Sequence, residues 1–346
     1  MDKAISFPRN CWYVAATPDE VQEKPLGRVL CGKSMVLFRT AGGQVSALED
    51  FCPHRGAPLS LGTVEDGLLV CGYHGMQMSA DGKCAGMAGQ SVERFKKGIQ
   101  SYPALERHGY IWVWPGVAAL ANADLIPDLH WARSPDWAFG GGMFHIQCDY
   151  RLLIDNLLDL THETYVHATS IGQPEIEESA PDTSREGQHV SVSRFMADIP
   201  APPFWQDALR ANHLDPDLLV DRWQVCRFTP PGSVMIDVGV AHAGHGGIEA
   251  PLDRRASGIV VDLITPATES SCWYFWGMAR NFNVRDSVLT RSIRESQLKI
   301  FTEDLEMLES QQRNLAAHPG RPLMSLNIDR GGVEARKILQ DLIAKE

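Results

Sequence analysis

Two cysteines and two histidines in the N-terminal third of the chain have the types and the spacing of metal ligands. In CPHRGAPLSLGTVEDGLLVCGYH they occur as Cys52-x-His54 and, after sixteen further residues, as Cys71-x-x-His74. Such a set can hold a zinc ion, or a [2Fe–2S] cluster with cysteine on one iron and histidine on the other. Zinc fingers usually pair cysteine with cysteine, whereas each half here offers one residue of each type. The order therefore favours a [2Fe–2S] cluster clasped by two loops, and a structural zinc site is the alternative.

A second candidate set lies in DNLLDLTHETYVH, residues 155–167, where His162 and His167 are five residues apart. On a regular helix, residues at this spacing diverge by about 140°, so a shared metal requires a distorted helix or a site near the helix end. By itself such a pair is more often structural than metal-binding. An electron-carrying cluster needs an acceptor, however, and two histidines with one carboxylate form the facial triad of non-haem iron oxygenases. The two histidines are therefore predicted to bind a mononuclear iron.

The third ligand of this iron must be a carboxylate, and the sequence offers local and distant candidates. Asp155, Asp159 and Glu163 lie within the same segment, whereas Asp304 lies far along the chain in LKIFTEDLEMLESQ. At helical spacing the neighbours of Asp304 are apolar: Ile300, Phe301 and Leu308. A carboxylate on a buried stripe is costly unless it is paired or bound to a metal. Asp304 is therefore the predicted third ligand, and a packing accident that leaves it at the helix rim is the alternative.

Short apolar runs separated by turn residues predict a small all-β domain over residues 1–118. The runs are RVLCG, SMVLFRT, QVSALED, LLVCGYH and YIWVWPG, and the turn signals AGG, DG and PG separate them. The two halves of the predicted cluster site fall on loops at the ends of such runs. Residues 119–346 are expected to form a second, α+β domain with a central antiparallel sheet flanked by helices.

Within the second domain, CDYRLLIDNLLDLTHETYVHA, residues 148–168, predicts one helix that follows a strand. Residues 168–220 predict a long irregular segment, because they are rich in Pro, Ser and Glu. Four strand-like runs follow, DRWQVCRFTP, SVMIDVGVAH, SGIVVDLITP and SCWYFWGMA, and the chain from residue 289 onward predicts two helices. These elements would have to bring residue 304 to residues 162 and 167.

Composition narrows the class of protein. A chain of 346 residues is long enough for one large domain or two ordinary ones, and its net charge of −11 argues against a nucleic-acid partner. The apolar runs fall far short of the roughly 20 residues that span a bilayer, and the first residues lack a secretory signal pattern. A cytoplasmic protein without a membrane partner is expected. Eight cysteines are too few for a disulfide scaffold.

The quoted segments resemble the Rieske non-haem iron oxygenases. The spacing C-x-H…C-x-x-H matches the Rieske motif, and DNLLDLTHETYVH matches the family's mononuclear-iron motif. Longer stretches, among them EDFCPHRGAPLSLG, GGGMFHIQCDYRLLIDNLLDLTHETYVHATSIGQ and WYFWGMARNF, are similar to oxygenase components of vanillate O-demethylases. The similarity runs essentially from end to end. The chain is more loosely similar to dicamba O-demethylase and other Rieske monooxygenases that act on aryl ethers.

The resemblance implies the ligands of both metal centres and an assembly in which neighbouring subunits cooperate. It assigns a Rieske [2Fe–2S] cluster to Cys52, His54, Cys71 and His74. It assigns mononuclear Fe(II) to His162, His167 and Asp304. It also implies a cyclic homotrimer in which the cluster of one subunit serves the iron of the next.

Two further polar residues of DNLLDLTHETYVH receive roles from this resemblance. Asp159 matches the family's aspartate three residues before the first histidine ligand, and would link His162 to the partner subunit's His74. A carboxylate that accepts a hydrogen bond from a metal-bound imidazole also orients the ring. Asn156 matches a position near the iron, outside the ligand set. Asp155 is expected to support either the helix or the surroundings of the metal.

The implied activity is O-demethylation of vanillate to protocatechuate and formaldehyde, with O₂ and electrons from NAD(P)H. Hydroxylation of the methoxy carbon would give a hemiacetal that collapses to the phenol and formaldehyde. The chain has no G-x-G-x-x-G after a strand, so a separate reductase with flavin and a plant-type ferredoxin centre would deliver the electrons. The basic stretch ERFKKG, residues 93–98, is a candidate docking site for it, although a solvated turn is the simpler explanation.

Other functions remain open at this point. The same machinery could act on another methoxylated aromatic acid or aryl ether, or hydroxylate a ring. A protein of a different class, a ferredoxin-like electron carrier without oxygenase activity, would use only the cluster. Arg222 and Arg227 could bind the carboxylate of an aromatic acid, but ion pairs explain them equally well.

Overall fold

The computed structural model of the chain describes residues 7–90 and 98–346. The chain divides into two compact units. The first comprises residues 1–128 together with 265–269 and 345–346, and the second comprises residues 129–264 and 270–344. The expected domain boundary after residue 118 stays a prediction; by compactness, residues 119–128 lie with the first unit. Of the basic stretch at residues 93–98, all but Gly98 lies outside the described residues.

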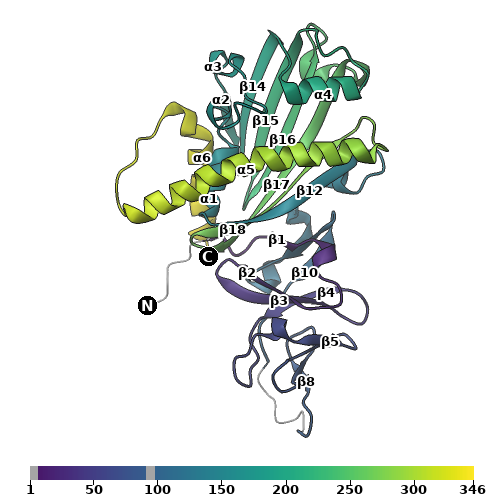
Figure 1. Ribbon diagram of the computed structural model, residues 1–346. Coiled ribbons are helices and arrows are strands. Elements are labelled where there is room, and N and C mark those ends of the chain that lie inside the picture. The colour runs from purple at the N-terminus through teal and green to yellow at the C-terminus, as the bar shows by residue number, and fades with distance from the viewer. Residues whose placement is uncertain (1–6, 91–97) are drawn as a thin grey trace. The chain divides into compact units, whose positions relative to one another are not determined.

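The described part of the first unit consists of three antiparallel sheets (Figure 1). The first sheet has the order β1 (Tyr13–Ala16), β11 (Tyr110–Val113), β10 (Ala104–Arg107). The second has the order β2 (Leu26–Leu30), β3 (Lys33–Arg39), β4 (Val45–Glu49), β9 (Ser101–Tyr102). The third has the order β5 (Thr63–Glu65), β6 (Leu68–Val70), β7 (Gln77–Met78), β8 (Cys84–Gly86). The prediction of a mostly β N-terminal domain is confirmed.

One hydrophobic core joins the second and third sheets of this unit. Its buried members include Val36, Phe38, Leu48, Leu59, Leu69, Met76 and Met78. Cys52 and Cys71 belong to the same core, and each is only 2% exposed. Cys52 follows β4 after a short turn and Cys71 directly follows β6. The strands therefore fix the start of both predicted cluster loops.

The second unit is built on a seven-stranded antiparallel sheet with the order β12-β18-β17-β16-β15-β14-β13. The strands are β12 (Ala138–Ile146), β13 (Asp182–Glu186), β14 (His189–Ile199), β15 (Val220–Thr229), β16 (Ser233–His242), β17 (Arg255–Thr268) and β18 (Ser271–Arg280). Every strand after β12 pairs with its successor in the chain, and β12 joins the edge beside β18. The predicted central antiparallel sheet and the four predicted strand runs are confirmed.

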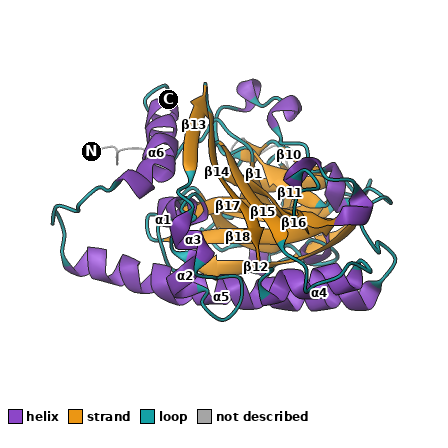
Figure 2. Cartoon of the chain, turned by 90° about the horizontal axis from the view of Figure 1, so that it is seen from above, coloured by secondary structure: helices purple, strands orange, loops and turns teal. Residues whose placement is uncertain are grey.

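Helices accompany this sheet (Figure 2). They are α1 (Tyr150–Leu157), α2 (Glu163–Val166), α3 (Glu175–Glu178), α4 (Pro203–Ala211), α5 (Ser287–Ala317) and α6 (Arg330–Ile343). The long α5 packs against β12 and β18, α6 packs against β13 and β14, and α1 contacts both α5 and α6. The Asp286 carboxylate accepts hydrogen bonds from the N–H groups of Val288 and Leu289, which caps the start of α5. None of the helices in the described ranges combines the length and the apolar character of a membrane span.

The prediction of an irregular segment over residues 168–220 is wrong. This range contains α3, β13, β14 and α4. In β14 the residues Val190, Val192, Arg194 and Met196 are buried, and the residues between them are more exposed. A half-buried strand needs only every second residue to face the core. The partly exposed Ser191 and Ser193 and the buried Arg194 make the composition of β14 mixed, which is why composition alone did not indicate a strand.

The prediction of one helix over residues 148–168 is also wrong. α1 ends at Leu157, and α2 is a single turn. Between them one Asp159 carboxylate oxygen accepts hydrogen bonds from the Thr161 N–H at 2.7 Å and from its hydroxyl at 2.6 Å. Aspartate commonly stabilises such a turn, which competes with helix. His162 and His167 therefore flank the single turn of α2, and the divergence expected on a continuous helix does not arise.

Candidate functional site

The two predicted cluster loops share one backbone hydrogen-bond pattern. The Gly56 N–H donates to the Cys52 carbonyl at 2.8 Å, and the Gly75 N–H donates to the Cys71 carbonyl at 2.9 Å. The N–H of each cysteine donates to the carbonyl five residues later, at 2.8 Å in both loops. Gly56 and Gly75 have left-handed φ values of 72° and 68°, which glycine adopts without steric penalty. The two loops thus present their cysteines in the same way.

The side chains on these loops form a donor set that fits a Rieske cluster. Cys52 and Cys71 are buried, whereas His54 and His74 are exposed, with their ring centroids 4.5 Å apart. Burial raises the pKa of the Cys52 thiol, and the neighbouring Cys71 thiol raises it further. A metal bound to these sulfurs would stabilise the thiolate form, which burial by itself disfavours. Two sulfurs and two imidazoles on facing loops are the Cys₂His₂ set of a Rieske [2Fe–2S] cluster.

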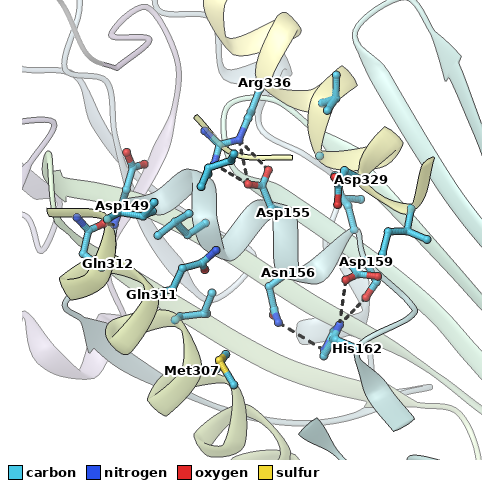
Figure 3. A pocket seen from close by; sticks show the side chains of 18 of the residues that line it. Asp149, Asp155, Asn156, Asp159, His162, Met307, Gln311, Gln312, Asp329 and Arg336 are labelled. Atoms are coloured by element: carbon cyan, nitrogen blue, oxygen red, sulfur yellow. Dashed lines mark hydrogen bonds and ion pairs between the residues drawn. The ribbon is translucent and has the colours of Figure 1, made fainter. Parts of the chain in front are cut away.

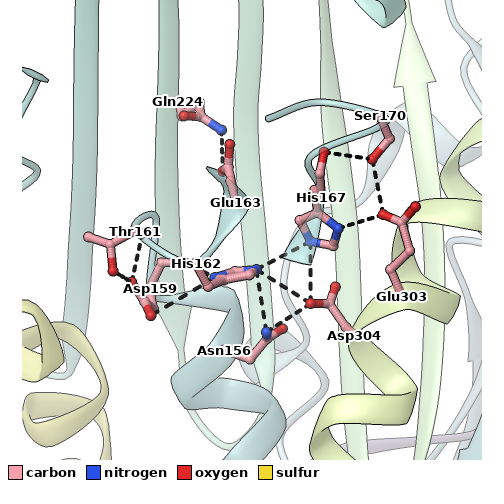
Figure 4. A network of polar contacts seen from close by, with 10 residues as sticks. All are labelled: Asn156, Asp159, Thr161, His162, Glu163, His167, Ser170, Gln224, Glu303 and Asp304. Atoms are coloured by element: carbon pink, nitrogen blue, oxygen red, sulfur yellow. Dashed lines mark hydrogen bonds and ion pairs between the residues drawn. The ribbon is translucent and has the colours of Figure 1, made fainter. Parts of the chain in front are cut away.

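The second unit brings His162, His167 and Asp304 together (Figure 4). The His162 Nε2 atom lies 3.3 Å from His167 Nε2 and 3.4 Å from the Asp304 Oδ1 atom, and the third side of this triangle is 3.3 Å. Ligand atoms about 2.1 Å from one ion, at angles of about 100°, lie about 3.2 Å apart. The three atoms therefore fit one face of a mononuclear iron. All three predicted ligands meet, and Asp304 is buried as the apolar stripe indicated.

Asn156 lies beside this triangle. Its side-chain amide donates to Asp304 Oδ1 at 3.0 Å and lies 3.4 Å from His162 Nε2. Asn156 is on α1, the histidines flank α2, and Asp304 is on α5. Because α1 packs against α5, a residue of α1 can hold a carboxylate of α5 at a fixed position next to the two imidazoles.

The surroundings of Asp159 differ in part from the expectation. The Nδ1 atom of His162 lies 2.7 Å from the main-chain carbonyl oxygen of Asp159, and 4.0 Å from its carboxylate. The carbonyl can only accept, so Nδ1 carries the proton and the Nε2 lone pair faces the triad. The Asp159 carboxylate instead supports the turn through Thr161. Within this chain, the closest contact of Asp159 with His162 is therefore through its backbone carbonyl.

Glu303 is a contact of the site that the sequence analysis missed. Its Oε2 atom lies 2.8 Å from His167 Nδ1, and the Ser170 hydroxyl donates to the same oxygen at 3.0 Å. Glu303 directly precedes Asp304, so the acidic pair ED in the sequence was the available signal. That signal is weak, because adjacent helical residues diverge by about 100° and do not normally serve one site.

The charges of the triad are mutually stabilised. Burial alone lowers the pKa of the His162 and His167 imidazoles, but the adjacent Asp304 carboxylate outweighs burial and raises both. Burial alone would raise the pKa of Asp304, but the two imidazoles hold it well below its usual range. The carboxylate thus stays ionised and the centre of the triangle attracts positive charge. A metal cation meets that demand.

The local acids that could have completed the triad have other partners. Asp155 accepts hydrogen bonds from the Arg336 guanidinium of α6 through both carboxylate oxygens, each 2.9 Å from Nε. The buried Glu163 accepts from the Gln224 amide at 2.6 Å and lies 3.3 Å from an Arg222 nitrogen. Asp155 therefore ties α1 to α6, and Glu163 ties α2 to the sheet.

The two arginines that were candidates for binding a substrate carboxylate have partners within the protein. Arg222 is buried, and besides Glu163 it donates to Gln173 Oε1 at 2.7 Å. Arg227 has a half-exposed side chain that lies 4.0 Å from Asp237. Arg222 thus satisfies buried polar groups of the fold, and Arg227 forms a loose ion pair.

A pocket of about 770 Å³ lies beside the triad, between α1, the C-terminal half of α5 and α6 (Figure 3). Asn156, Asp159 and His162 line it near the triad, and Asp155 and Arg336 line it toward α6. The loop that follows α5 contributes exposed apolar side chains, Leu323, Met324 and Ile328. The Asp159 side of the triad therefore faces a sizeable, partly apolar pocket.

Comparisons with known proteins agree with both sites. Residues 146–345 match the vanillate O-demethylase oxygenase C-terminal domain, and residues 11–103 match the Rieske [2Fe–2S] domain. A vanillate O-demethylase oxygenase subunit of Pseudomonas sp. (strain HR199 / DSM 7063) is 58% identical, over 98% of this chain and 96% of that protein. The subunit of Pseudomonas sp. (strain ATCC 19151) is 62% identical, over 92% and 96%.

A solved structure extends the likeness to the fold. The crystal structure of dicamba monooxygenase with non-heme iron and dicamba has a TM-score of 0.82 and 30% sequence identity, and the match covers 98% of each chain. Together with the triad and the cluster loops, these matches show an enzyme whose cofactors are a Rieske [2Fe–2S] cluster and a mononuclear non-haem iron. The chain belongs to the vanillate O-demethylase oxygenase family of Rieske-type monooxygenases.

Proposed function

We propose that this protein is the oxygenase component of a vanillate O-demethylase, which converts vanillate to protocatechuate and formaldehyde. The triad of His162, His167 and Asp304 carries the proposal, because its atoms lie 3.3–3.4 Å apart in the donor set of non-haem iron oxygenases. The substrate is inferred from the relatives that are 58% and 62% identical, both of them vanillate O-demethylase oxygenase subunits.

The proposed ligands are those that the sequence predicted. The cluster is assigned to Cys52, His54, Cys71 and His74. The mononuclear iron is assigned to His162, His167 and Asp304. When bound, the two centres supply electron delivery and O₂ activation.

The other polar residues of the site orient the ligand side chains through hydrogen bonds. Asn156 donates to one Asp304 oxygen and so holds that carboxylate in position. The Asp159 carbonyl and the Glu303 carboxylate each face an imidazole Nδ1 atom. Both histidines therefore keep the tautomer whose Nε2 lone pair can bind a metal.

The proposed reaction consumes one O₂, two electrons and two protons for each methyl group removed. One oxygen atom enters a C–H bond of the methoxy group, and the other leaves as water. The resulting hemiacetal transfers its hydroxyl proton toward the aryl oxygen as the C–O bond breaks, which gives the phenol and formaldehyde. The electrons are proposed to come from NAD(P)H through a separate flavin and ferredoxin reductase.

A homotrimer in which Asp159 links neighbouring subunits is part of the same proposal. Asp159 lines the pocket beside the triad, where the loop after α5 exposes apolar side chains. Around the cluster loops, Phe51 and Tyr73 are exposed, and the Tyr73 ring lies 3.9 Å from the His74 ring. Two exposed, partly apolar surfaces that each carry a ligand histidine support contact between copies, with the Asp159 carboxylate accepting from the partner subunit's His74. A cytoplasmic location stays a prediction.

Substrate turnover with a supplied reductase tests the proposed activity. Formaldehyde release and NADH oxidation are measured with vanillate, with other methoxylated benzoates and with dicamba. Stoichiometric formaldehyde and protocatechuate from vanillate, with the largest kcat/KM in the panel, are expected. A larger kcat/KM for another methoxylated acid than for vanillate would make that acid the preferred substrate. No formaldehyde from any aryl ether would contradict O-demethylation itself.

A further inference from the structure

The structure assigns a positioning role to Glu303: its carboxylate orients the iron ligand His167 and strengthens the site's hold on a divalent cation. The inference rests on the proposed ligand set, and it adds a residue outside that set. Glu303 is not itself placed to bind the metal, since its Oε2 atom faces His167 Nδ1, the nitrogen turned away from the triad.

The two consecutive acids of α5 contact opposite nitrogens of one imidazole (Figure 4). Asp304 Oδ1 lies 3.3 Å from His167 Nε2, and Glu303 Oε2 lies 2.8 Å from His167 Nδ1. A carboxylate accepts but does not donate, so Glu303 fixes the proton on Nδ1 and leaves the Nε2 lone pair for a metal. His167 is only 2% exposed, so water has little access to replace Glu303 as the acceptor.

The second histidine of the triad provides a contrast. The His162 Nδ1 atom faces the neutral main-chain carbonyl of Asp159 at 2.7 Å. A carboxylate accepts a stronger hydrogen bond than a neutral carbonyl and makes the imidazole a better electron donor. The two imidazoles therefore differ in their support: His162 is oriented by the backbone of its own turn, whereas His167 is oriented by a charge.

The other contacts of Glu303 favour this role over a simple surface ion pair. The Ser170 hydroxyl donates to the same Oε2 atom at 3.0 Å, so that oxygen is held by two donors. The Lys299 side chain is more than half exposed, and its ammonium lies 3.9 Å from the other oxygen, Oε1, where solvent weakens the attraction. The negative charge near His167 is thus only weakly compensated by protein cations, and it adds to the attraction of the site for a metal.

Metal binding to Glu303 variants tests the inference without any turnover. The mononuclear iron is removed from the holoenzyme by mild chelation, with the cluster retained, and Co(II) is titrated anaerobically while its visible bands are recorded. Glu303→Gln keeps an oxygen that can accept from Nδ1 but removes the charge, and Glu303→Ala removes both. Glu306→Gln is the matched control, because Glu306 is exposed on the same helix. His167→Ala serves as the ligand reference.

The expected Kd for Co(II) rises about 10- to 100-fold in Glu303→Gln, at least as much in Glu303→Ala, and not in Glu306→Gln. The visible bands of the bound Co(II) are expected to shift in the Glu303 variants. Wild-type Kd and bands in both Glu303 variants, together with weakened binding in His167→Ala, would overturn the role of Glu303 alone. Wild-type binding in His167→Ala would overturn the proposed ligand set, and this inference with it.

Discussion

The two metal-binding regions of this chain are built in opposite ways. The proposed cluster ligands all fall within residues 52–74, on two loops whose shape is held by backbone hydrogen bonds and by Gly56 and Gly75. The proposed iron ligands are residues 162, 167 and 304. They are oriented by Asn156 on α1, by the Asp159 carbonyl in the turn after α1, and by Glu303 on α5. The cluster site therefore depends on local backbone shape, and the iron site depends on packing between α1, α2 and α5.

Exposure separates the two regions as well. His54 and His74 are exposed, whereas His167 and Asp304 are buried. An electron-transfer centre benefits from an edge that a partner can approach, because electrons must enter and leave through it. A centre that activates O₂ benefits from burial, because water would compete with the reaction. A variant that disturbs loop backbone shape should thus affect the cluster site alone, and a variant that disturbs polar side chains around the triad should affect the iron site alone.

The largest effect is expected from Gly75→Val. A β-branched residue at a φ of 68° is strained, and the strained residue also donates the hydrogen bond to the Cys71 carbonyl. Most of the cluster absorbance and of the labile sulfide should be lost, while about one iron per chain remains. Gly89→Val is the matched control, because Gly89 has a φ of 73° and, like Gly75, open space around a built Cβ atom. Cluster loss of equal size in both variants would show that the loop hydrogen bond has no special role.

A loss of at least about tenfold in NADH-coupled turnover is expected from Asp159→Asn. The variant keeps an oxygen that can accept from Thr161, and the main-chain carbonyl still faces His162. It loses the negative charge that is proposed to join the sites of neighbouring subunits. Both metals should stay bound, and turnover driven by peroxide, which bypasses the cluster, should stay near the wild-type rate. An unchanged NADH-coupled rate would refute the proposed role of Asp159 in linking neighbouring subunits.

A smaller effect, confined to stability, is expected from Asp155→Asn. Asp155 pairs with Arg336, and both side chains are 35% exposed, so solvent limits the value of the pair to about 1 kcal/mol. The melting temperature should fall by a few degrees, because α1 and α6 lose their ionic contact. Metal content and turnover should not change. A loss of iron in this variant would instead place Asp155 in the support of the iron site.

The smallest effect concerns pH. Burial raises the pKa of Asp262 on β17 to about 8, and the hydrogen bond from the Tyr274 hydroxyl only partly offsets it. The folded state therefore holds a proton that the unfolded state releases above its ordinary pKa of about 4. The raised pKa of Asp262 therefore adds to the free energy of unfolding at low pH, and this contribution is lost as pH rises toward 8. Between pH 5 and 8 the melting temperature of Asp262→Asn should fall less than that of the wild type, by on the order of 2–4 °C. If the melting temperatures of the wild type and of Asp262→Asn fall by the same amount between pH 5 and 8, Asp262 is not a buried neutral acid.

The contrast between the regions also explains what the sequence could predict. Cys52, His54, Cys71 and His74 lie on short loops, so their spacing alone indicated a shared site. Asp304 was found through the apolar stripe on its helix, because a buried acid needs a partner. The role proposed for Asp159, by contrast, depends on a second subunit and stays a prediction.

The features that the sequence analysis missed depend on tertiary packing. Glu303 reaches His167 only because α5 crosses the sheet beside α2, and no periodicity places two adjacent acids around one ring. The break after α1 depends on the Asp159 carboxylate, which accepts a hydrogen bond from the Thr161 N–H two residues later. Such a turn competes with continuation of the helix. β14 was missed because polar residues such as Ser191, Ser193 and Arg194 give it a mixed composition. In each case local composition was compatible with two structures, and packing decided between them.

Iron and acid-labile sulfide, quantified on His162→Ala beside the wild type, test the central claim most directly. His162 Nε2 is one corner of the triangle with sides of 3.3–3.4 Å, while the cluster loops lie in the other unit. The account predicts the loss of one iron per chain with sulfide and cluster absorbance unchanged. Iron content equal to the wild type would contradict it.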